Sequence, residues 1–369
     1  MAARCRGFLP ILRRMSSMAS TSQGIPTAAR RTLRCGVVGV GRMGRHHARL
    51  YTQIDGADLV GVVDRDAERR QGIVEQYGGK GFATVEELIA HGVDAVTIAT
   101  PTVHHRDAAE KLLAAGVACL IEKPLAPDVR DAQAIADAAA RSGAVLQVGH
   151  VVRFDPVMVA VRKLELQPMF VEVDRVSPMT FRSVDVGVVL DMMIHDIDVL
   201  LMLIGSEPEE IHANAVSVLG EAEDVCNARL VFPAGPSGVR CVANITASRL
   251  ALKTERKIRI ISDQSYVSAD FVERKGTVVR KSANDEKIRE LREALRDGKD
   301  LSSMNYLELV SIDPLEVGAG EPLRLQAEDF LDAARTGRKP FVDATAGFAA
   351  VRTAERIVAA AKAAGARMV

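Results

Sequence analysis

Residues 32–44 read TLRCGVVGVGRMG, a short apolar run that leads directly into three glycines spaced GxGxxG. The valines of the run suit a buried parallel strand and residues 42–51 can continue as a helix, which places the glycines at a strand-to-helix turn. At such a turn Gly39 permits the bend, Gly41 lets a pyrophosphate approach the backbone, and Gly44 lets the helix pack close to the strand. The stretch therefore predicts a dinucleotide-binding site.

A second apolar segment, residues 58–63, ends in Asp64, about 20 residues beyond Gly44. A carboxylate at this position can accept hydrogen bonds from both hydroxyls of an adenine ribose. It would also repel the extra phosphate of NADP, although the adjacent Arg65 could partly accept one. We therefore predict NAD as the cofactor.

The length and composition indicate the class of protein. A chain of 369 residues suggests two domains, since single cores seldom grow much past ~250 residues. The 48 basic and 48 acidic residues balance and aromatic residues make up only 4%, so no basic stripe or stacking platform for nucleic acid is indicated. Because no run of about 18 apolar residues occurs, no membrane span is predicted. We expect a small-molecule substrate and neither a nucleic-acid nor a membrane partner.

The cysteines and the N-terminus bear on the compartment. The cysteines are odd in number, scattered and without CxxC spacing, which argues against a disulfide framework or a zinc site and favours a cytoplasmic protein. Residues 1–33 are rich in arginine and serine and contain no acidic residue, a composition that resembles a mitochondrial transit peptide. A disordered extension, or initiation at Met15 or Met18, is the alternative that we favour.

Between residues 34 and 152 strand and helix patterns alternate, as in a right-handed parallel sheet. The third predicted strand ends in Thr100 and Pro101, at the edge where open α/β sheets bind ligands. His104 and His105 follow and are both candidate cofactor contacts, although histidines at a helix start are more commonly exposed to solvent without a role. The predicted strands are residues 35–40, 58–63, 95–99, 118–121 and 145–148.

The fourth of these strands continues into Glu122, Lys123 and Pro124. An acid and an ammonium thereby lie at the same ligand-facing edge, followed by a proline that restricts the turn. A surface ion pair is the alternative, but the position after a buried run, one strand beyond the Thr100 turn, favours a site in which Lys123 lies near a reacting hydroxyl.

After Gly149 and His150 the pattern changes to strands with incomplete period-two alternation, typical of a mostly antiparallel sheet with one covered face. The charged segment 281–301 matches no motif and is interpreted as a solvated, partly helical insertion. The predicted strands are residues 170–178, 211–219, 223–232, 237–248, 257–263 and 264–273.

One apolar helix interrupts these strands, with the sequence LDMMIHDIDVLLMLIG at residues 190–205. Asp191, His195 and Asp198 are spaced i, i+4 and i+7, which predicts that all three lie on one helix face. A helix this apolar is buried, so the polar face must contact something polar or charged. A divalent metal site is the rival interpretation. An ammonium from Lys123 in the same pocket would disfavour a cation, so we predict no metal.

The motifs GVGRMG, ATPTVHH, EKPL and DMMIHDID, in this order, resemble the glucose-fructose oxidoreductase and inositol dehydrogenase (Gfo/Idh/MocA) family from Arg34 onward. The resemblance implies an α/β Rossmann domain with a doubly wound parallel sheet, and an α+β domain with an open, mostly antiparallel sheet. It also implies an NAD-dependent sugar dehydrogenase that acts as a homodimer or homotetramer. The predicted boundaries are residues 34–152 for the NAD-binding domain, 153–343 for the substrate domain, and 344–369 for a C-terminal helix that returns to the first domain.

The resemblance further implies that Lys123, Asp191 and His195 are catalytic. An imidazole has an unperturbed pKa near ~6.5, which suits removal of the hydroxyl proton, so His195 is the predicted general base. Lys123 would stabilise the developing alkoxide, and Asp191 would orient the substrate or the imidazole. The predicted cofactor-binding residues are Gly39, Gly41, Arg42, Met43, Gly44, Asp64, Thr100, Pro101, His104, Glu122 and Lys123.

The segments GHVVRFDP, from Gly149, and RVSPMTFRSVDVGVVLDMMIHDID, from Arg175, resemble the branch that includes UDP-N-acetylglucosamine 3-dehydrogenases. We therefore predict oxidation at C3 of this nucleotide sugar, with inositol or free-hexose oxidation and a non-catalytic sugar or nucleotide sensor as alternatives. The predicted substrate-binding residues are Arg153, Arg175 and Arg182, through the diphosphate, together with Asp191 and His195. Alternatively, the arginines are surface charges or pair with Asp155, Asp174 and Asp185.

Overall fold

The structure, a computed structural model, describes residues 31–180, 186–219, 222–235, 238–281, 285–300 and 309–366. Residues 1–30 of the predicted N-terminal extension lie outside the described residues. The segment that contains Arg182 also lies outside them. Within the described part, no helix is long and apolar enough to cross a membrane. Cys35, Cys119, Cys226 and Cys241 are buried free thiols.

A six-stranded parallel sheet forms the first half of the chain, as the sequence predicted. Its strands lie in the order β3-β2-β1-β4-β5-β6, the doubly wound arrangement in which the strand order reverses beside β1. The strands are β1 (Leu33–Val38), β2 (Ala57–Val63), β3 (Lys80–Phe82), β4 (Ala95–Ile98), β5 (Ala118–Glu122) and β6 (Leu146–Gly149). The short edge strand β3 was not predicted, because the three residues of Lys80–Phe82 carry too little pattern to stand out.

Helices connect these strands and cover the sheet. The helices and helical turns of this half are α1 (Arg42–Tyr51), α2 (Ala67–Tyr77), α3 (Val85–His91), η2 (Thr102–His104), α4 (His105–Ala114) and α5 (Val129–Ser142). The predicted bounds of α1 are confirmed. Its N-terminus follows the glycine turn directly, so the backbone N–H groups that begin the helix face the ligand edge of the sheet.

The second half contains an eight-stranded sheet in the order β14-β13-β12-β11-β7-β10-β9-β8. All neighbouring pairs are antiparallel except β7 and β10, so the prediction of a mostly antiparallel sheet is confirmed. The strands are β7 (Pro168–Val176), β8 (Glu210–Val216), β9 (Val225–Ala234), β10 (Arg240–Ser248), β11 (Glu255–Ser262), β12 (Ser265–Asp270), β13 (Lys275–Lys281) and β14 (Val310–Pro314). The sequence analysis missed β13 and β14, whose charged residues mask the alternation.

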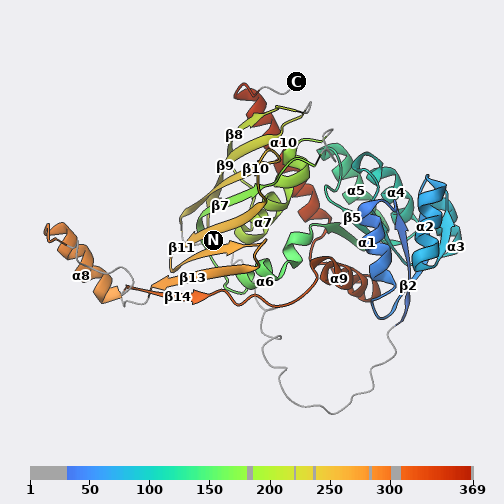
Figure 1. Cartoon of the computed structure of the whole chain (residues 1–369), viewed down its shortest axis with the longest axis horizontal. Helices are drawn as coiled ribbons and strands as arrows, with labels where there is room; N and C mark the ends of the chain where they lie inside the picture. Colours follow the sequence, from blue (N-terminus) through green and yellow to red (C-terminus); the bar gives the residue numbers. More distant parts are fainter. Residues whose placement is uncertain are drawn as a thin grey trace, which may run out of the picture. The chain divides into compact units, whose positions relative to one another are not determined.

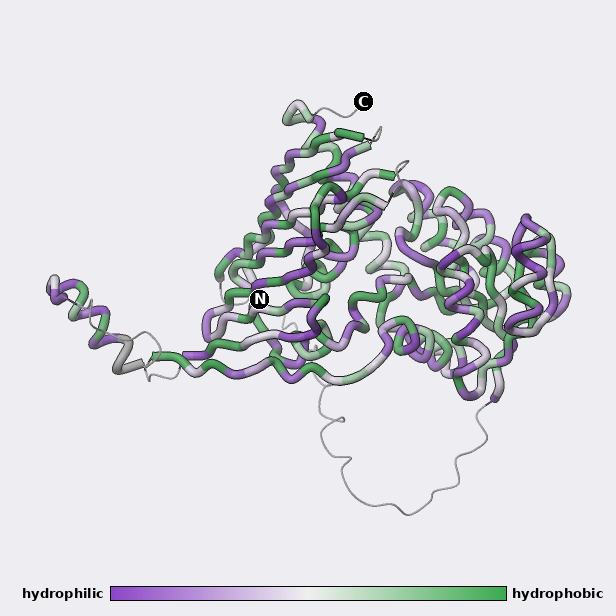
Figure 2. The backbone as a smooth tube through the Cα atoms, viewed as in Figure 1, coloured by the Kyte–Doolittle hydropathy of each residue, from purple (hydrophilic) through white to green (hydrophobic). Residues whose placement is uncertain are grey.

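One face of this sheet is covered by helices. In Figure 1, α7 and α10 lie along the sheet, and both pack on its strands. Alternate side chains of the central strands β7 and β10 are buried on this face, and Figure 2 shows the corresponding alternation of hydrophobic and hydrophilic residues. The remaining helices and turns are η3 (Val151–Phe154), α6 (Pro156–Arg162), η4 (Val189–Met193), α7 (Ile194–Ile204), α8 (Asp285–Arg296), α9 (Pro322–Thr336) and α10 (Ala344–Ala363).

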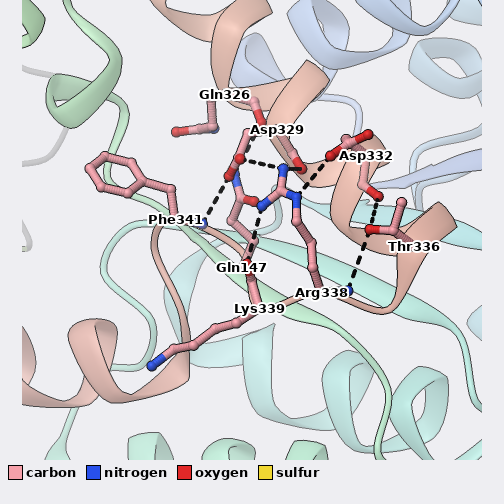
Figure 3. A network of polar contacts seen from close by, with 8 residues as sticks. All are labelled: Gln147, Gln326, Asp329, Asp332, Thr336, Arg338, Lys339 and Phe341. Carbon is pink, nitrogen blue, oxygen red and sulfur yellow. Dashed lines mark hydrogen bonds and ion pairs between the residues drawn. The ribbon is translucent and has the colours of Figure 1, made fainter. Parts of the chain in front are cut away.

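The segment between α9 and α10 is held by a polar network around Arg338 (Figure 3). The guanidinium of Arg338 donates to Asp332 and Asp329, and Asp329 also accepts the backbone N–H of Phe341 at 2.9 Å. Gln147 on β6 donates to the backbone oxygen of Gln326 at 3.0 Å. These bonds join the C-terminal segment to the parallel sheet, and α10 then packs on both α5 and α7. The exact domain boundaries stay predictions.

Candidate functional site

The three glycines of the β1–α1 turn are required for different reasons. Gly39 has a φ of +82°, and a Cβ there would lie 2.7 Å from the backbone nitrogen of Thr100. A Cβ on Gly44 would lie 1.9 Å from the backbone oxygen of Gly39, so α1 packs on the turn only without a side chain. A Cβ on Gly41 would have no atom within 4 Å, so this backbone faces open space. The turn therefore leaves room for a ligand at Gly41 alone.

That open space belongs to a cavity of about 600 Å³, which we call the first cavity. Asp64 lies at the end of β2 on its wall, where Oδ2 accepts the backbone N–H of Val40 at 2.9 Å and Oδ1 accepts that of Asp66 at 3.0 Å. The predicted cofactor-binding residues that line it are Gly39, Gly41, Asp64, Thr100, Pro101 and His104. A volume of this size, the gap at Gly41 and a fixed carboxylate fit the adenosine half of NAD.

We expect kcat/KM with NAD to exceed that with NADP at least about tenfold. The two backbone bonds hold the Asp64 carboxylate in place, so a 2′-phosphate on the ribose would meet a fixed like charge. Arg69, which lies 3.5 Å from Asp64, already shares its charge with Asp64 and Asp66. Initial rates with each cofactor at equal concentration test this, and comparable turnover with NADP would contradict it.

A second cavity of about 570 Å³ lies between the carboxyl edge of the parallel sheet and the start of α7. Side chains from both halves of the chain meet there. The predicted residues that line this second cavity are Arg42, Met43, Thr100, Glu122, Lys123, Arg175, Asp191 and His195. Because Thr100 lines both cavities, a dinucleotide can extend from the first into the second. Gly44 lines neither cavity and acts through packing.

Lys123 is bound by the helical turn that carries Asp191. Its Nζ donates to the backbone oxygen of Asp191 at 2.6 Å and to the carboxylate at 3.1 Å. We predicted that Asp191 orients the substrate or the imidazole of His195. In the structure, the carboxylate of Asp191 instead binds the ammonium group of Lys123. The lysine side chain is thereby directed across the cavity toward η4.

Glu122, beside Lys123, is held in place by a histidine of α1. Its carboxylate forms a hydrogen bond with the buried ring of His47 at 2.8 Å. Burial alone would raise the pKa of Glu122, but the bond to His47 and the charges of His47 and Lys123 outweigh it and keep this pKa below its ordinary value. Glu122 is therefore an ionised group on the cavity wall. The sequence analysis missed His47, which lies one turn of α1 away from the glycines and had no signal of its own.

His195 lies on the cavity wall with its Nδ1 buried and without a hydrogen-bond partner among the described residues. Burial, followed by the charges of Lys123, Arg175, His150 and Arg256, lowers the pKa of His195 well below its ordinary value. The imidazole is therefore neutral near pH 7 and able to accept a proton.

The predicted stripe of Asp191, His195 and Asp198 does not converge on one site. Residues 189–193 form a π-helical turn, which changes the angular relation of Asp191 to the α-helix that follows. Asp198 is buried and accepts two hydrogen bonds from Arg153, at 2.7 and 2.6 Å. Since each carboxylate binds a different cation, the arrangement does not suit the rival metal site.

The π-helical turn η4 is capped by Glu223. The carboxylate of Glu223 is buried and accepts the backbone N–H of Val189 at 3.1 Å, while its backbone oxygen accepts that of Val188 at 2.9 Å. Gly187 faces this carboxylate so closely that a Cβ there would lie 2.0 Å from Oε1. The absence of a side chain at Gly187 therefore leaves room for the cap that positions Asp191.

We expect Glu223→Ala to lower kcat about tenfold with little change in KM for NAD. Loss of the cap leaves a buried N–H unsatisfied at the start of η4, a defect of about 1–3 kcal/mol that the turn relieves by moving Asp191 and Lys123. Glu223→Gln is the matched control, because its amide oxygen can still accept the bond. Steady-state rates and melting temperatures distinguish the two variants, and equal kcat values would contradict a positioning role.

The two histidines of the Thr100 turn differ. His104 lines the first cavity, and its role as a cofactor contact stays a prediction. The prediction of a solvent-exposed His105 is wrong: the ring is buried, and its two nitrogens lie 3.1 and 2.9 Å from the backbone oxygens of Pro124 and Thr100. His105 therefore ties the turn after β4 to the turn after β5.

The predicted phosphate-binding arginines have other partners. Arg153 is buried, pairs with Asp198 and does not line the second cavity, so its expected role at a diphosphate is wrong for this arrangement. Arg175 lines the cavity but donates its Nε and Nη2 to Asp196 at 2.8 and 2.6 Å. Neither is a surface charge or pairs with the acids suggested by sequence proximity. Arg182 lies outside the described residues.

Two arginines that were not predicted also line the second cavity. Arg249 at the end of β10 donates to Asp224 at 2.7 Å and to the backbone oxygen of Val186 at 2.9 Å. Arg256 lies at the start of β11. Both lie at the ends of strands that are far from η4 in sequence, so only the sheet pairing could reveal them.

Comparisons with known proteins agree with this geometry. A family described as an oxidoreductase family with an NAD-binding Rossmann fold matches residues 33–150, and the GFO/IDH/MocA C-terminal domain matches residues 170–267. UDP-N-acetylglucosamine 3-dehydrogenase of Acidithiobacillus ferrooxidans is 33% identical over 85% of this chain and 93% of its own length. A crystal structure of that enzyme has a TM-score of 0.79 at 32% identity and covers 90% of this chain and 98% of the other. Inositol 2-dehydrogenase of Rhizobium meliloti is 29% identical over 65% of this chain and 76% of its own length.

Proposed function

The chain belongs to the GFO/IDH/MocA oxidoreductase family, and we propose that it oxidises the C3 hydroxyl of UDP-N-acetylglucosamine, or of a close relative, to the 3-keto sugar with NAD as acceptor. The convergence of Lys123, Asp191 and His195 on a cavity that adjoins the NAD-binding turn carries this proposal. The relative from Acidithiobacillus ferrooxidans, which is similar along 93% of its length, supports the choice of sugar.

NAD is the cofactor of this enzyme, and when bound it would supply the acceptor for the hydride that leaves the sugar carbon. Gly41 and Asp64 would hold the adenosine and pyrophosphate half, with Arg42 and Glu122 on the wall of the adjoining cavity. The chemical task left to the protein is to bind the sugar and to remove one proton from its hydroxyl.

His195 accepts that proton. It is neutral at pH 7 because burial and neighbouring cations depress its pKa, and it lies on the cavity wall. The ammonium group of Lys123 stabilises the negative charge that develops on the oxygen of the reacting hydroxyl. Asp191 orients this ammonium group through a hydrogen bond of 3.1 Å. The C–H bond breaks with loss of a hydride, the O–H bond breaks with loss of a proton to the imidazole, and a ketone forms.

Oxidation of inositol or a free hexose is the second candidate, because the inositol 2-dehydrogenase of Rhizobium meliloti is also similar. Absorbance of reduced nicotinamide distinguishes the two. Incubation with NAD and UDP-N-acetylglucosamine, with a 3-aminotransferase to remove the ketone, should form NADH. Oxidation of myo-inositol or a free hexose without any reaction of the nucleotide sugar would refute the substrate and retain the family.

We also infer a homo-oligomer in which the uncovered face of the eight-stranded sheet packs on another copy. Strand pairing places one apolar residue of each of seven strands in a continuous row on that face: Val231, Val242, Phe170, Ile261, Tyr266, Val279 and Ile312. Such a row is ordinarily covered in folded proteins. Light scattering of the wild type and of Val279→Glu tests it: the variant should have the smaller mass, and a monomeric wild type would contradict the inference.

A further inference from the structure

Arg175 and Arg256 lie directly opposite each other on the antiparallel strands β7 and β11. Arg175 alternates with the buried Val171 and Val173, and Arg256 is two residues before the buried Ile258. Both arginines therefore lie on the helix-covered face, and both line the second cavity. Like charges directly opposite on paired strands are destabilising, so this position calls for compensating negative charge.

The protein itself compensates only one of the two charges. Asp196 on α7 binds Arg175 through two hydrogen bonds. Arg256 is an exposed residue whose guanidinium has no hydrogen bond or ion pair with any residue in the described ranges. Partial burial and the charge of Arg175 lower its pKa, and the charges of Asp196 and Asp155 offset only part of this effect. On the outer face of the same strands, Glu172 pairs with Arg259 at 2.5 Å. Between β7 and β11, Arg259 on the outer face thus has a carboxylate partner, whereas Arg256 inside the cavity has none among the described residues.

Three other cations of the second cavity, Lys123, Arg175 and Arg249, have carboxylate partners in the structure. Lys123 pairs with Asp191, and Arg249 pairs with Asp224. Arg42 begins α1 directly after Gly41, where the pyrophosphate of NAD approaches the backbone. Among the described residues on the cavity wall, Arg256 is then the cation available for a substrate, and it comes from the half of the chain that does not carry the NAD turn.

We propose that Arg256 binds a phosphate group of the substrate and so selects phosphorylated sugars, such as nucleoside diphosphate sugars, over neutral ones. The planar guanidinium presents paired N–H groups that match two phosphate oxygens. A bound phosphate also supplies the negative charge that the Arg175–Arg256 pair lacks. The proposal rests on the proposed function for the identity of the sugar and adds the group that recognises its phosphate.

Kinetics and binding of Arg256→Met test this. KM for UDP-N-acetylglucosamine and Kd for UDP, measured by calorimetry on the NADH-loaded enzyme, should both rise roughly 10- to 100-fold, the range for a charge-assisted hydrogen bond. We expect kcat to change only a few-fold and KM for NAD to stay constant. The melting temperature should not fall, because a like-charge contact is removed. Arg256→Lys keeps the positive charge but lacks the paired N–H groups. Its KM for UDP-N-acetylglucosamine and its Kd for UDP should lie between those of Arg256→Met and the wild type.

Arg259→Met is the matched control, since this arginine lies on the same strand and faces the other way. It should bind UDP as the wild type does. Equal UDP affinity in Arg256→Met and wild type, or no binding of UDP to the wild type, would overturn the inference. UDP binding that depends on Arg256 without oxidation of UDP-N-acetylglucosamine would refute the proposed function and retain the phosphate site. Oxidation of UDP-N-acetylglucosamine by Arg256→Met with an unchanged KM for this substrate would refute the phosphate site and retain the proposed function.

Discussion

His195→Ala and Lys123→Met should each lower kcat roughly 10²-fold or more, the usual scale for a general acid-base group, while KM for NAD changes little. In the proposed mechanism His195 removes the hydroxyl proton and Lys123 stabilises the oxygen that remains, so each variant would lose an interaction that grows in the transition state. Neither residue lines the first cavity, where we expect the adenosine half of NAD to bind. Steady-state rates at saturating NAD measure both effects.

The pH dependence of the wild type adds a second measurement. An imidazole whose pKa is lowered from 6.5 accepts a proton only above that lowered pKa, so the acid limb of kcat/KM should lie below pH 6.5. The unfolded chain binds this proton with an ordinary pKa. The contribution of His195 to stability is therefore present above pH 6.5 and decreases as the pH falls below it. In His195→Ala the acid limb should disappear.

His212→Ala provides a control for the histidine variant, because this residue is exposed on β8, outside both cavities. Its kcat should equal that of the wild type. Near-native turnover in His195→Ala or Lys123→Met would remove that residue from the mechanism.

Gly44→Ala should reduce both stability and NAD affinity, the latter by more than tenfold. The new Cβ would lie 1.9 Å from the backbone oxygen of Gly39, so α1 must move away from the turn that binds the pyrophosphate. Overpacking of this kind usually costs about 1–3 kcal/mol and can exceed that when backbone must move. Thermal unfolding without cofactor and titration with NADH measure the two effects.

Gly41→Ala separates packing from ligand space. Gly41 has a φ of −65°, which any residue adopts, and its Cβ would have no neighbour within 4 Å. We expect the melting temperature without cofactor to match the wild type while KM for NAD rises, because the methyl group occupies space that the pyrophosphate needs. A lower melting temperature for Gly41→Ala than for Gly44→Ala would contradict this assignment of the two glycines.

Much of the fold follows from local pattern. The apolar run before Gly39 and the helix after Gly41 formed as predicted, since both depend on residues that are neighbours in sequence. The strands of the second sheet were found wherever alternation was strong. Lys80–Phe82 and Val310–Pro314 were missed, because short edge strands are defined by the partner with which they pair and carry little pattern of their own.

The sequence by itself predicted the glycine turn and the acid at Asp64, because spacing along a strand or helix places such groups without knowledge of the rest. The resemblance to a family implied the catalytic roles of Lys123, Asp191 and His195. Only the tertiary structure decided which charges are satisfied. Arg153 and Arg175 come before α7 in sequence and bind its aspartates. Arg256, some 80 residues beyond Arg175, is brought opposite it by the pairing of β7 and β11. An ion pair depends on distances of a few ångströms between side chains, and these are set by strand register and helix packing.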